Sequence, residues 1–260
     1  MKTSQHLIIS IICSFVCLIF IGSVIGLAIF FLNEKTIVVP NDFPTIQEAV
    51  NEAEEGDIIF VRASGGPYVQ NVVINKDNLN LIGLGKMKPV LDGTMIGGNG
   101  LTLNGTSGVI VQNFTVQQYG LNIVLSSSNE NKIMNNRCNG GVEGIFLADS
   151  NQNKIEKNSC NNNSIGIELD NAKSNLVKGN DVISNNNGIV IEDDSDDNLI
   201  KRNVVNDNVL NGISLSGNSN ENDVFFNHVL GNGNLDIIDQ DDNNLIGNRC
   251  NNSNIASICN

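Results

Sequence analysis

The chain has 260 residues, a formal net charge of -13 at pH 7 and no tryptophan. So acidic a balance argues against nucleic-acid binding, which needs lysine and arginine to neutralise phosphates, and it disfavours docking on anionic lipid. Acidic polyuronates would also be repelled unless cations bridge them. The sparse aromatic residues and the many glycines and asparagines fit a solenoid of narrow stacked layers better than a globular α/β enzyme.

The first predicted element is a membrane anchor. Residues 7–32 carry no charged side chain and are mostly apolar, which is enough to span a bilayer with some tilt and exceeds the apolar part of a secretory signal peptide. The positive flank formed by Lys2 and the amino terminus predicts that residues 1–6 are cytoplasmic. We therefore expect a single-pass signal anchor in the cell membrane with the rest of the chain extracytoplasmic; a cleaved signal peptide is the alternative.

Residues 36–68 are predicted to form a cap. Thr45 and Glu48 have the spacing of a capping box, which starts a short helix. One face of this helix is apolar and carries Ile46, Ala49, Val50 and Ala53. A solenoid must seal the open end of its core, and its terminal units are atypical for that reason.

Further along, the sequence repeats with a period of about 22 residues. Glycine or asparagine opens each repeat, at positions that are 22, 22, 22, 24 and 22 residues apart: Asn122, Gly144, Gly166, Gly188, Gly212 and Asn234. Two other positions hold only asparagine. The first set is Asn131, Asn153, Asn175, Asn198, Asn222 and Asn243, and the second is Asn136, Asn158, Asn180, Asn203, Asn227 and Asn248.

Within each repeat the apolar residues alternate, which indicates short strands. Stacked repeats of this kind predict an all-β fold, a right-handed parallel β-helix solenoid, over residues 36–255. The regular coils occupy residues 100–255, and residues 256–260 form a short polar tail. We interpret the asparagines as structural ladders that satisfy buried polar groups, and we attribute the glycines to turns that need left-handed geometry.

The segment VPNDFPTIQEAVNEAEEGDIIFVRASGGPYVQNVVINKDNLNLIG resembles the opening of right-handed β-helix proteins related to pectin esterases. The later Asn-x-Ile units resemble the repeats of the NosD-like group and of the carbohydrate-binding and sugar-hydrolase group. Together the resemblance covers about residues 36–255 and implies the β-helix fold. It implies little about activity, because unrelated functions share this scaffold.

The catalytic motifs of these groups are not found in the sequence. The pectin-esterase set of a Gln, two Asp and an Arg has no counterpart, and no Gly-His-Gly segment accompanies the Asp pairs as in polygalacturonases. Copper, which the name of the NosD-like group suggests, needs imidazole or sulfur ligands. His228, Met87, Met95 and Met134 do not cluster in sequence, so no copper site is predicted.

A set of carboxylates gives the best candidate site. Glu168, Asp170 and Glu192 fall on outward strand positions of adjacent coils, and paired carboxylates at such spacing suit glycoside hydrolysis. The adjoining turn carries Asp193, Asp194, Asp196 and Asp197, which are oxygen ligands suited to Ca²⁺. In both places a solvated acidic face is the alternative interpretation.

Four cysteines follow the anchor. Cys138 and Cys160 occupy a slot that is valine in other coils, so we expect buried free thiols. Cys250 and Cys259 could form a disulfide in an oxidising compartment. Aromatic residues that could stack on sugars are few, and the candidates are Tyr68, Tyr119 and Phe146.

Three functions remain open from the sequence. The leading prediction is a membrane-anchored, non-catalytic protein that binds a polysaccharide or an envelope protein and needs no cofactor, with calcium as an option. The second is a polysaccharide hydrolase or lyase that uses the acidic face. The third, which the NosD-like resemblance implies, is an accessory subunit of a membrane transport or maturation system.

Overall fold

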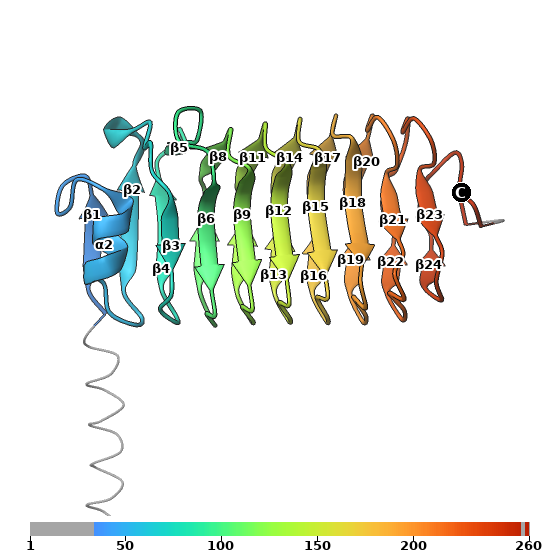
Figure 1. The fold of residues 1–260 in the computed structure, drawn as a ribbon, viewed down its shortest axis with the longest axis horizontal. Coiled ribbons are helices and arrows are strands. Elements are labelled where there is room, and N and C mark those ends of the chain that lie inside the picture. The colour runs from blue at the N-terminus through green and yellow to red at the C-terminus, as the bar shows by residue number, and fades with distance from the viewer. Residues whose placement is uncertain (1–33, 256–257, 260) are drawn as a thin grey trace, which may run out of the picture. The chain divides into compact units, whose positions relative to one another are not determined.

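The computed structural model describes residues 34–255 and 258–259. Contacts divide the chain into two compact units, Met1–Lys35 and Thr36–Asn260. The second unit is a parallel β-solenoid, as expected (Figure 1). The predicted anchor, residues 7–32, lies outside the described residues, and within the described ranges no helix is long and apolar enough to cross a membrane.

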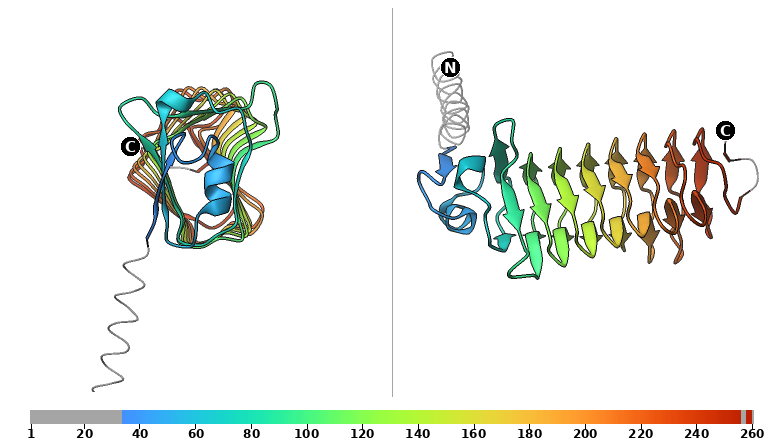
Figure 2. Two further views of the ribbon diagram at one scale, coloured as in Figure 1. Left: turned by 90° about the vertical axis from the view of Figure 1, so that its left-hand side faces the viewer. Right: turned by 90° about the horizontal axis from the view of Figure 1, so that it is seen from above.

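A short helix follows the first strand, as the capping box at Thr45 predicts. Strand β1 (Thr36–Val39) is followed by helix α2 (Ile46–Glu52), strand β2 (Ile58–Arg62) and the short 3-10 helix η1 (Ala63–Gly65). The Thr45 hydroxyl accepts a hydrogen bond from the Glu48 backbone N–H at 3.1 Å, as an N-cap should. The apolar face of α2 is buried, and the helix lies across the open end of the coils when they are viewed along their axis (Figure 2, left).

Three parallel sheets form the walls of the solenoid. Sheet A consists of β1, β2, β4 (Asn80–Leu84), β7 (Ile110–Gln112), β10 (Lys132–Met134), β13 (Lys154–Glu156), β16 (Leu176–Lys178), β19 (Leu199–Lys201), β22 (Asp223–Phe225) and β24 (Asn244–Ile246). Sheet B consists of β5 (Val90–Asp92), β8 (Thr115–Gln117), β11 (Arg137–Asn139), β14 (Ser159–Asn161), β17 (Asp181–Ile183) and β20 (Val204–Asn206). Sheet C consists of β3 (Val72–Ile74), β6 (Asn99–Asn104), β9 (Leu121–Ser126), β12 (Glu143–Ala148), β15 (Ile165–Asp170), β18 (Asn187–Glu192), β21 (Ile213–Leu215) and β23 (Ile237–Asp239).

The asparagine ladders are confirmed. In both predicted sets each Asn side chain except the last donates to the Oδ1 of the Asn one coil further along, over 2.9–3.2 Å in the first set and 3.0–3.3 Å in the second. The structure adds a third ladder, between sheets B and C, that the sequence analysis missed: Asn163, Asn185, Asn208 and Asn232. Buried polar groups at all three bends are therefore paired from coil to coil.

The glycines that open the repeats do not serve as left-handed turn residues, contrary to the prediction. Gly144, Gly166, Gly188 and Gly212 do not adopt the left-handed backbone that was expected of them. A Cβ at any of them would lie closer than 3.0 Å to the carbonyl oxygen of the next coil. The left-handed positions belong instead to turn residues of many types, such as Lys157. These four positions hold glycine because the backbones of adjacent coils approach one another closely at them.

The cysteines behave as the sequence suggests. Cys138 and Cys160 are buried free thiols on paired strands β11 and β14, and burial is the largest factor that raises the pKa of Cys160. Cys250 and Cys259 form a disulfide, which closes the C-terminal tail against the last coil.

Candidate functional site

Four carboxyl groups from three consecutive coils gather on the outer face of sheet C. Glu143 begins β12, Glu168 and Asp170 lie on β15, and Glu192 ends β18. The register places Asp170 beside Glu192, as the repeat predicts. Neighbouring strands of a sheet lie about 4.8 Å apart, so side chains from these strands reach one another.

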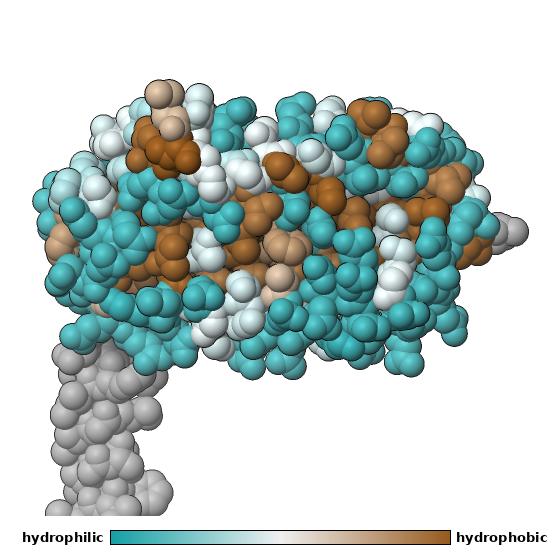
Figure 3. Space-filling model, viewed as in Figure 1, coloured by the Kyte–Doolittle hydropathy of each residue, from teal (hydrophilic) through white to brown (hydrophobic). Residues whose placement is uncertain are grey.

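The surroundings of Glu168 differ from the prediction. It was expected to face solvent, but only 7% of it is exposed. In register it lies between Phe146 on β12 and Val190 on β18. Most of this row of sheet C is apolar, because Val73, Thr102, Val124, Phe146, Glu168, Val190, Ser214 and Ile238 follow one another along it. Figure 3 shows the resulting apolar band along this face of the solenoid.

Two carboxyl oxygens of the cluster are buried and lack a hydrogen-bond partner within the described residues: Oε2 of Glu143 and Oε2 of Glu168. A buried polar atom without a partner is costly, and its presence points to strain, chemistry or a ligand. The sequence analysis missed Glu143. The neighbouring coils carry no acidic residue at the position in register with Glu143, so the repeat pattern does not reveal it. The residues in register are Asn99, Leu121, Ile165 and Asn187.

Burial and mutual repulsion shift the pKa values of these groups upward. Burial is the largest cause, and with the charges of Glu143, Glu192 and Asp170 it raises the pKa of Glu168 to about 8. Burial and the charges of Glu192 and Asp170 raise the pKa of Glu143. The pKa of Asp170 is raised by burial and by the nearby Asp193 and Asp149. At neutral pH, Glu168 therefore keeps its proton, which is the state required of a general acid.

The buried Glu168 predicts how stability depends on pH. Its folded pKa of about 8 lies above the ordinary value of 4.5, so the folded state binds more protons between these values and stability falls as pH rises through them. We expect urea midpoints of the wild-type chain to drop between about pH 5 and pH 8.5 relative to those of Glu168→Gln, which cannot titrate. Equal pH profiles for the two proteins would contradict the raised pKa.

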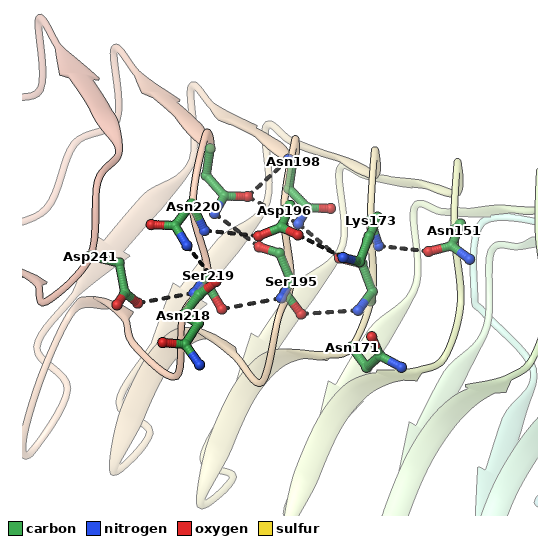
Figure 4. Close-up of polar contacts among 12 residues, drawn as sticks. Asn151, Asn171, Lys173, Ser195, Asp196, Asn198, Asn218, Ser219, Asn220 and Asp241 are labelled. Atoms are coloured by element: carbon green, nitrogen blue, oxygen red, sulfur yellow. Dashed lines mark hydrogen bonds and ion pairs between the residues drawn. The ribbon is translucent and has the colours of Figure 1, made fainter.

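The four aspartates of the adjoining turn do not act as one group. Asp196 accepts a hydrogen bond from Lys173 Nζ at 2.6 Å and another from the Asn220 backbone N–H at 2.9 Å (Figure 4). Partial burial acts to raise the pKa of Asp196, but these hydrogen bonds outweigh it and lower the pKa. The remaining three are exposed and have left-handed backbone: Asp193, Asp194 and Asp197. Among the described residues, no three His, Cys, Asp or Glu side chains converge as a metal site, so calcium binding stays a prediction.

Two of the three proposed sugar-stacking residues are wrong. Tyr68 and Tyr119 belong to the core, with 4% and 2% exposure. Their hydroxyls donate to the backbone oxygens of Arg62 and Gln70 at 2.7 and 2.6 Å. Phe146 remains as the aromatic side chain at this site, directly beside Glu168.

Comparison with known proteins identifies relatives of the fold. A family model described as the periplasmic copper-binding protein NosD matches residues 85–259. Among solved structures, the periplasmic alginate epimerase AlgG is 15% identical with a TM-score of 0.59, and the match covers 85% of this chain and 55% of AlgG. The pectate lyase Pel9A is 12% identical with a TM-score of 0.59, over 86% of this chain and 80% of the lyase. The catalytic domain of a GH87 α-1,3-glucanase is 12% identical with a TM-score of 0.57, over 84% of this chain and 54% of that domain.

These structural matches show the fold alone, because their sequence identities are low. The chain spans only about half the length of the epimerase and of the glucanase domain that it matches. No curated protein matches the sequence.

The described residues do not fit a copper site. Copper in proteins is held by imidazole, thiolate and thioether ligands. His228 is the one histidine in the described part of the chain, and the free thiols of Cys138 and Cys160 lie inside the core. The methionines lie in three separate places, two of them exposed: Met87, Met95 and Met134.

Proposed function

Because the chain belongs to the NosD family of parallel β-helix proteins, we propose that it is an extracytoplasmic protein that binds a neutral glycan on the outer face of sheet C. The observation that carries this proposal is Glu168, a buried acid with an unpartnered oxygen set in an apolar row. Residues 7–32 would anchor the protein in the membrane.

The chemistry of sugars matches this surface. Sugar hydroxyls are hydrogen-bond donors, and they would supply partners for the Oε2 atoms of Glu143 and Glu168, which lack them within the described residues. Sugar rings also present apolar C–H faces, which pack well on an aromatic ring such as Phe146 beside an aliphatic side chain such as Val190. The surrounding carboxylates favour a neutral glycan over an acidic one.

A second function, polysaccharide cleavage, is favoured by the proton that Glu168 retains at neutral pH. Glycoside hydrolysis needs one carboxylic acid to protonate the leaving oxygen and one carboxylate to act as base or nucleophile. Glu168 would be the acid, and Asp170 or Glu192 would be the carboxylate. Binding and cleavage are separable by the choice of variant.

The test is binding of the full-length chain to a panel of neutral glycans, with and without Ca²⁺, together with an assay for shortened products. Glu168→Leu removes the acceptor while it suits the apolar row, and we expect about tenfold weaker binding; Phe146→Ala should have a similar effect. Glu168→Gln keeps a hydrogen-bonding group of the same shape, so it should retain most binding and abolish any product formation.

Glu221→Gln is the matched control, because Glu221 is exposed on a turn away from sheet C. Its affinity should equal that of the wild type. Unchanged affinity in Glu168→Leu and Phe146→Ala, or no binding to any neutral glycan, would refute the proposal. A requirement for Ca²⁺ that Asp194→Asn removes would assign calcium to the acidic turn.

A further inference from the structure

The outer face of sheet A carries a cluster of basic side chains, in contrast to the carboxyl groups on sheet C. Although the chain is strongly acidic overall, six of its 15 basic side chains lie on the outer positions of β10, β13, β16 and β19 or on the turn that follows: Lys132, Lys154, Lys157, Lys178, Lys201 and Arg202. Central residues of these strands are buried and the flanking ones are not. The basic side chains therefore face solvent together.

A cleft of about 360 Å³ lies at the C-terminal end of this surface. Lys178, Lys201 and Phe225 occupy equivalent positions on three consecutive strands. Arg202 and Phe226 follow Lys201 and Phe225 on the adjoining turn and also line the cleft. Three cations thus line one part of the cleft, and two aromatic rings line the next coil. One acidic side chain, Asp223, also lines the cleft and accepts a hydrogen bond from the Asn244 side chain at 3.1 Å.

The cations of the cleft are poorly neutralised. Lys178 lies 3.6 Å from Glu156, a long ion pair between partly exposed side chains. Within the described residues, Lys201 and Arg202 take part in no ion pair. Exposed cations without partners are free to meet an anionic ligand.

The aromatic rings are placed as a platform and not as part of the core. The ring centroids of Phe225 and Phe226 are 6.4 Å apart, and Phe226 is 60% exposed. Phe226 also has φ 56°, a left-handed backbone that is strained for an aromatic residue. A Cβ at Gly247 on the next coil would lie closer than 3.0 Å to the Phe226 ring, so this glycine leaves the ring room to rest against the backbone.

We propose that this cleft binds an anionic polysaccharide, in which sugar rings carry regularly spaced carboxylate, sulfate or phosphate groups. The acidic groups contact Lys178, Lys201 and Arg202, and a sugar ring packs on Phe225 and Phe226. Successive coils repeat every 4.8 Å or so, comparable to the length of one sugar unit, so a chain laid along the cleft meets one contact at each of the three coils that line it. The net charge of -13 would repel a polyuronate elsewhere on the chain, but the side chains of this part of sheet A are locally basic. Nucleic acid needs a larger basic footprint.

The test is binding of the full-length chain to a polyuronate and to a sulfated glycan, measured by titration at several salt concentrations. Lys201→Glu/Arg202→Glu should weaken binding at least about tenfold at low salt and reduce its salt dependence. Phe225→Ala/Phe226→Ala should weaken binding about fivefold and leave the salt dependence unchanged, because the rings contribute no charge. The two ligands distinguish carboxylate from sulfate recognition.

Lys132→Glu/Lys154→Glu is the matched control, because these exposed lysines lie on the same sheet outside the cleft and change the net charge equally. Its affinity for the glycan should stay within about twofold of that of the wild type, and this small change measures the effect of net charge alone. Equal losses in this control and in Lys201→Glu/Arg202→Glu, an absence of binding at low salt, or tighter binding of single-stranded DNA than of either glycan would overturn the proposal. Glu168→Leu should leave this binding intact, so the sheet A and sheet C proposals fail separately.

Discussion

Replacing Asn180 with alanine is expected to lower the free energy of unfolding by about 3–5 kcal/mol. The Asn180 side chain donates to the Ile155 carbonyl at 2.8 Å and to Asn203 Oδ1 at 3.0 Å. Its Oδ1 accepts from the backbone N–H and the side-chain amide of Asn158, at 2.8 and 3.1 Å. Alanine would leave buried groups of two neighbouring coils without partners, and each costs about 1–3 kcal/mol.

The measurement is urea unfolding of the variant and the wild type, followed by far-UV circular dichroism. Asn186→Ala serves as the control, because Asn186 is an exposed residue of the same coil and its side chain belongs to no ladder. The control should fall within about 0.5 kcal/mol of the wild type. If Asn180→Ala is equally mild, the ladder does not hold the coils together and our account of it is wrong.

Gly188→Ala is expected to destabilise the fold by about 3 kcal/mol or more, although it adds a single methyl group. The new Cβ would lie closer than 3.0 Å to the carbonyl oxygen of Gly212 and to Val205 Cγ1. The carbonyl oxygen belongs to the backbone of the next coil, so relief requires the two coils to move apart. Such a movement would lengthen the strand hydrogen bonds between β18 and β21.

Gly105→Ala separates this effect from backbone strain. Gly105 has φ 65° and open space where a Cβ would be, so alanine there should cost only about 1 kcal/mol. Gly188→Ala/Val205→Ala removes one of the two clashes and should recover only part of the lost stability. Urea unfolding of the three variants is the measurement, and equal losses for Gly188→Ala and Gly105→Ala would show that crowding between coils is not the cause.

The sequence predicts most of the fold because each coil of a solenoid uses the same contacts, so the residues that make them recur at the same place in each repeat. Two ladders, the strands between them and the N-cap at Thr45 each leave a pattern that appears again or matches a known capping signal. Where the repeat breaks, register becomes ambiguous. Phe114 takes the place of an asparagine at the start of the second ladder, and its backbone N–H donates to Asn136.

The third ladder was missed for the same reason. In the coil before Asn163 its place is taken by Gly141, and the side chain of Asn122, from a different position in the repeat, donates to Asn163 instead. The substitution preserves the hydrogen bond but not the sequence pattern. The ladder therefore continues into this coil although the equivalent sequence position no longer holds asparagine.

The candidate site was only partly predictable, because its chemistry depends on neighbours one coil away. The repeat predicts that Asp170 lies beside Glu192, but it does not predict that the Glu168 side chain is buried. That burial follows from Phe146 and Val190 at the same position in the flanking coils, a signal present in the aligned repeats but visible only when they are compared across coils. Phe225 and Lys201 are aligned in the same way on sheet A.

The hydrogen bonds between coils run along the solenoid axis, whereas the covalent chain winds around it. A tensile load along the axis is therefore carried by non-covalent bonds in series, and the weakest coil yields before its neighbours. Each coil that opens releases about 22 residues, which extend by roughly 75 Å. The Cys250–Cys259 disulfide keeps the last loop closed under such a load. We therefore expect the domain to lengthen one coil at a time under such a load.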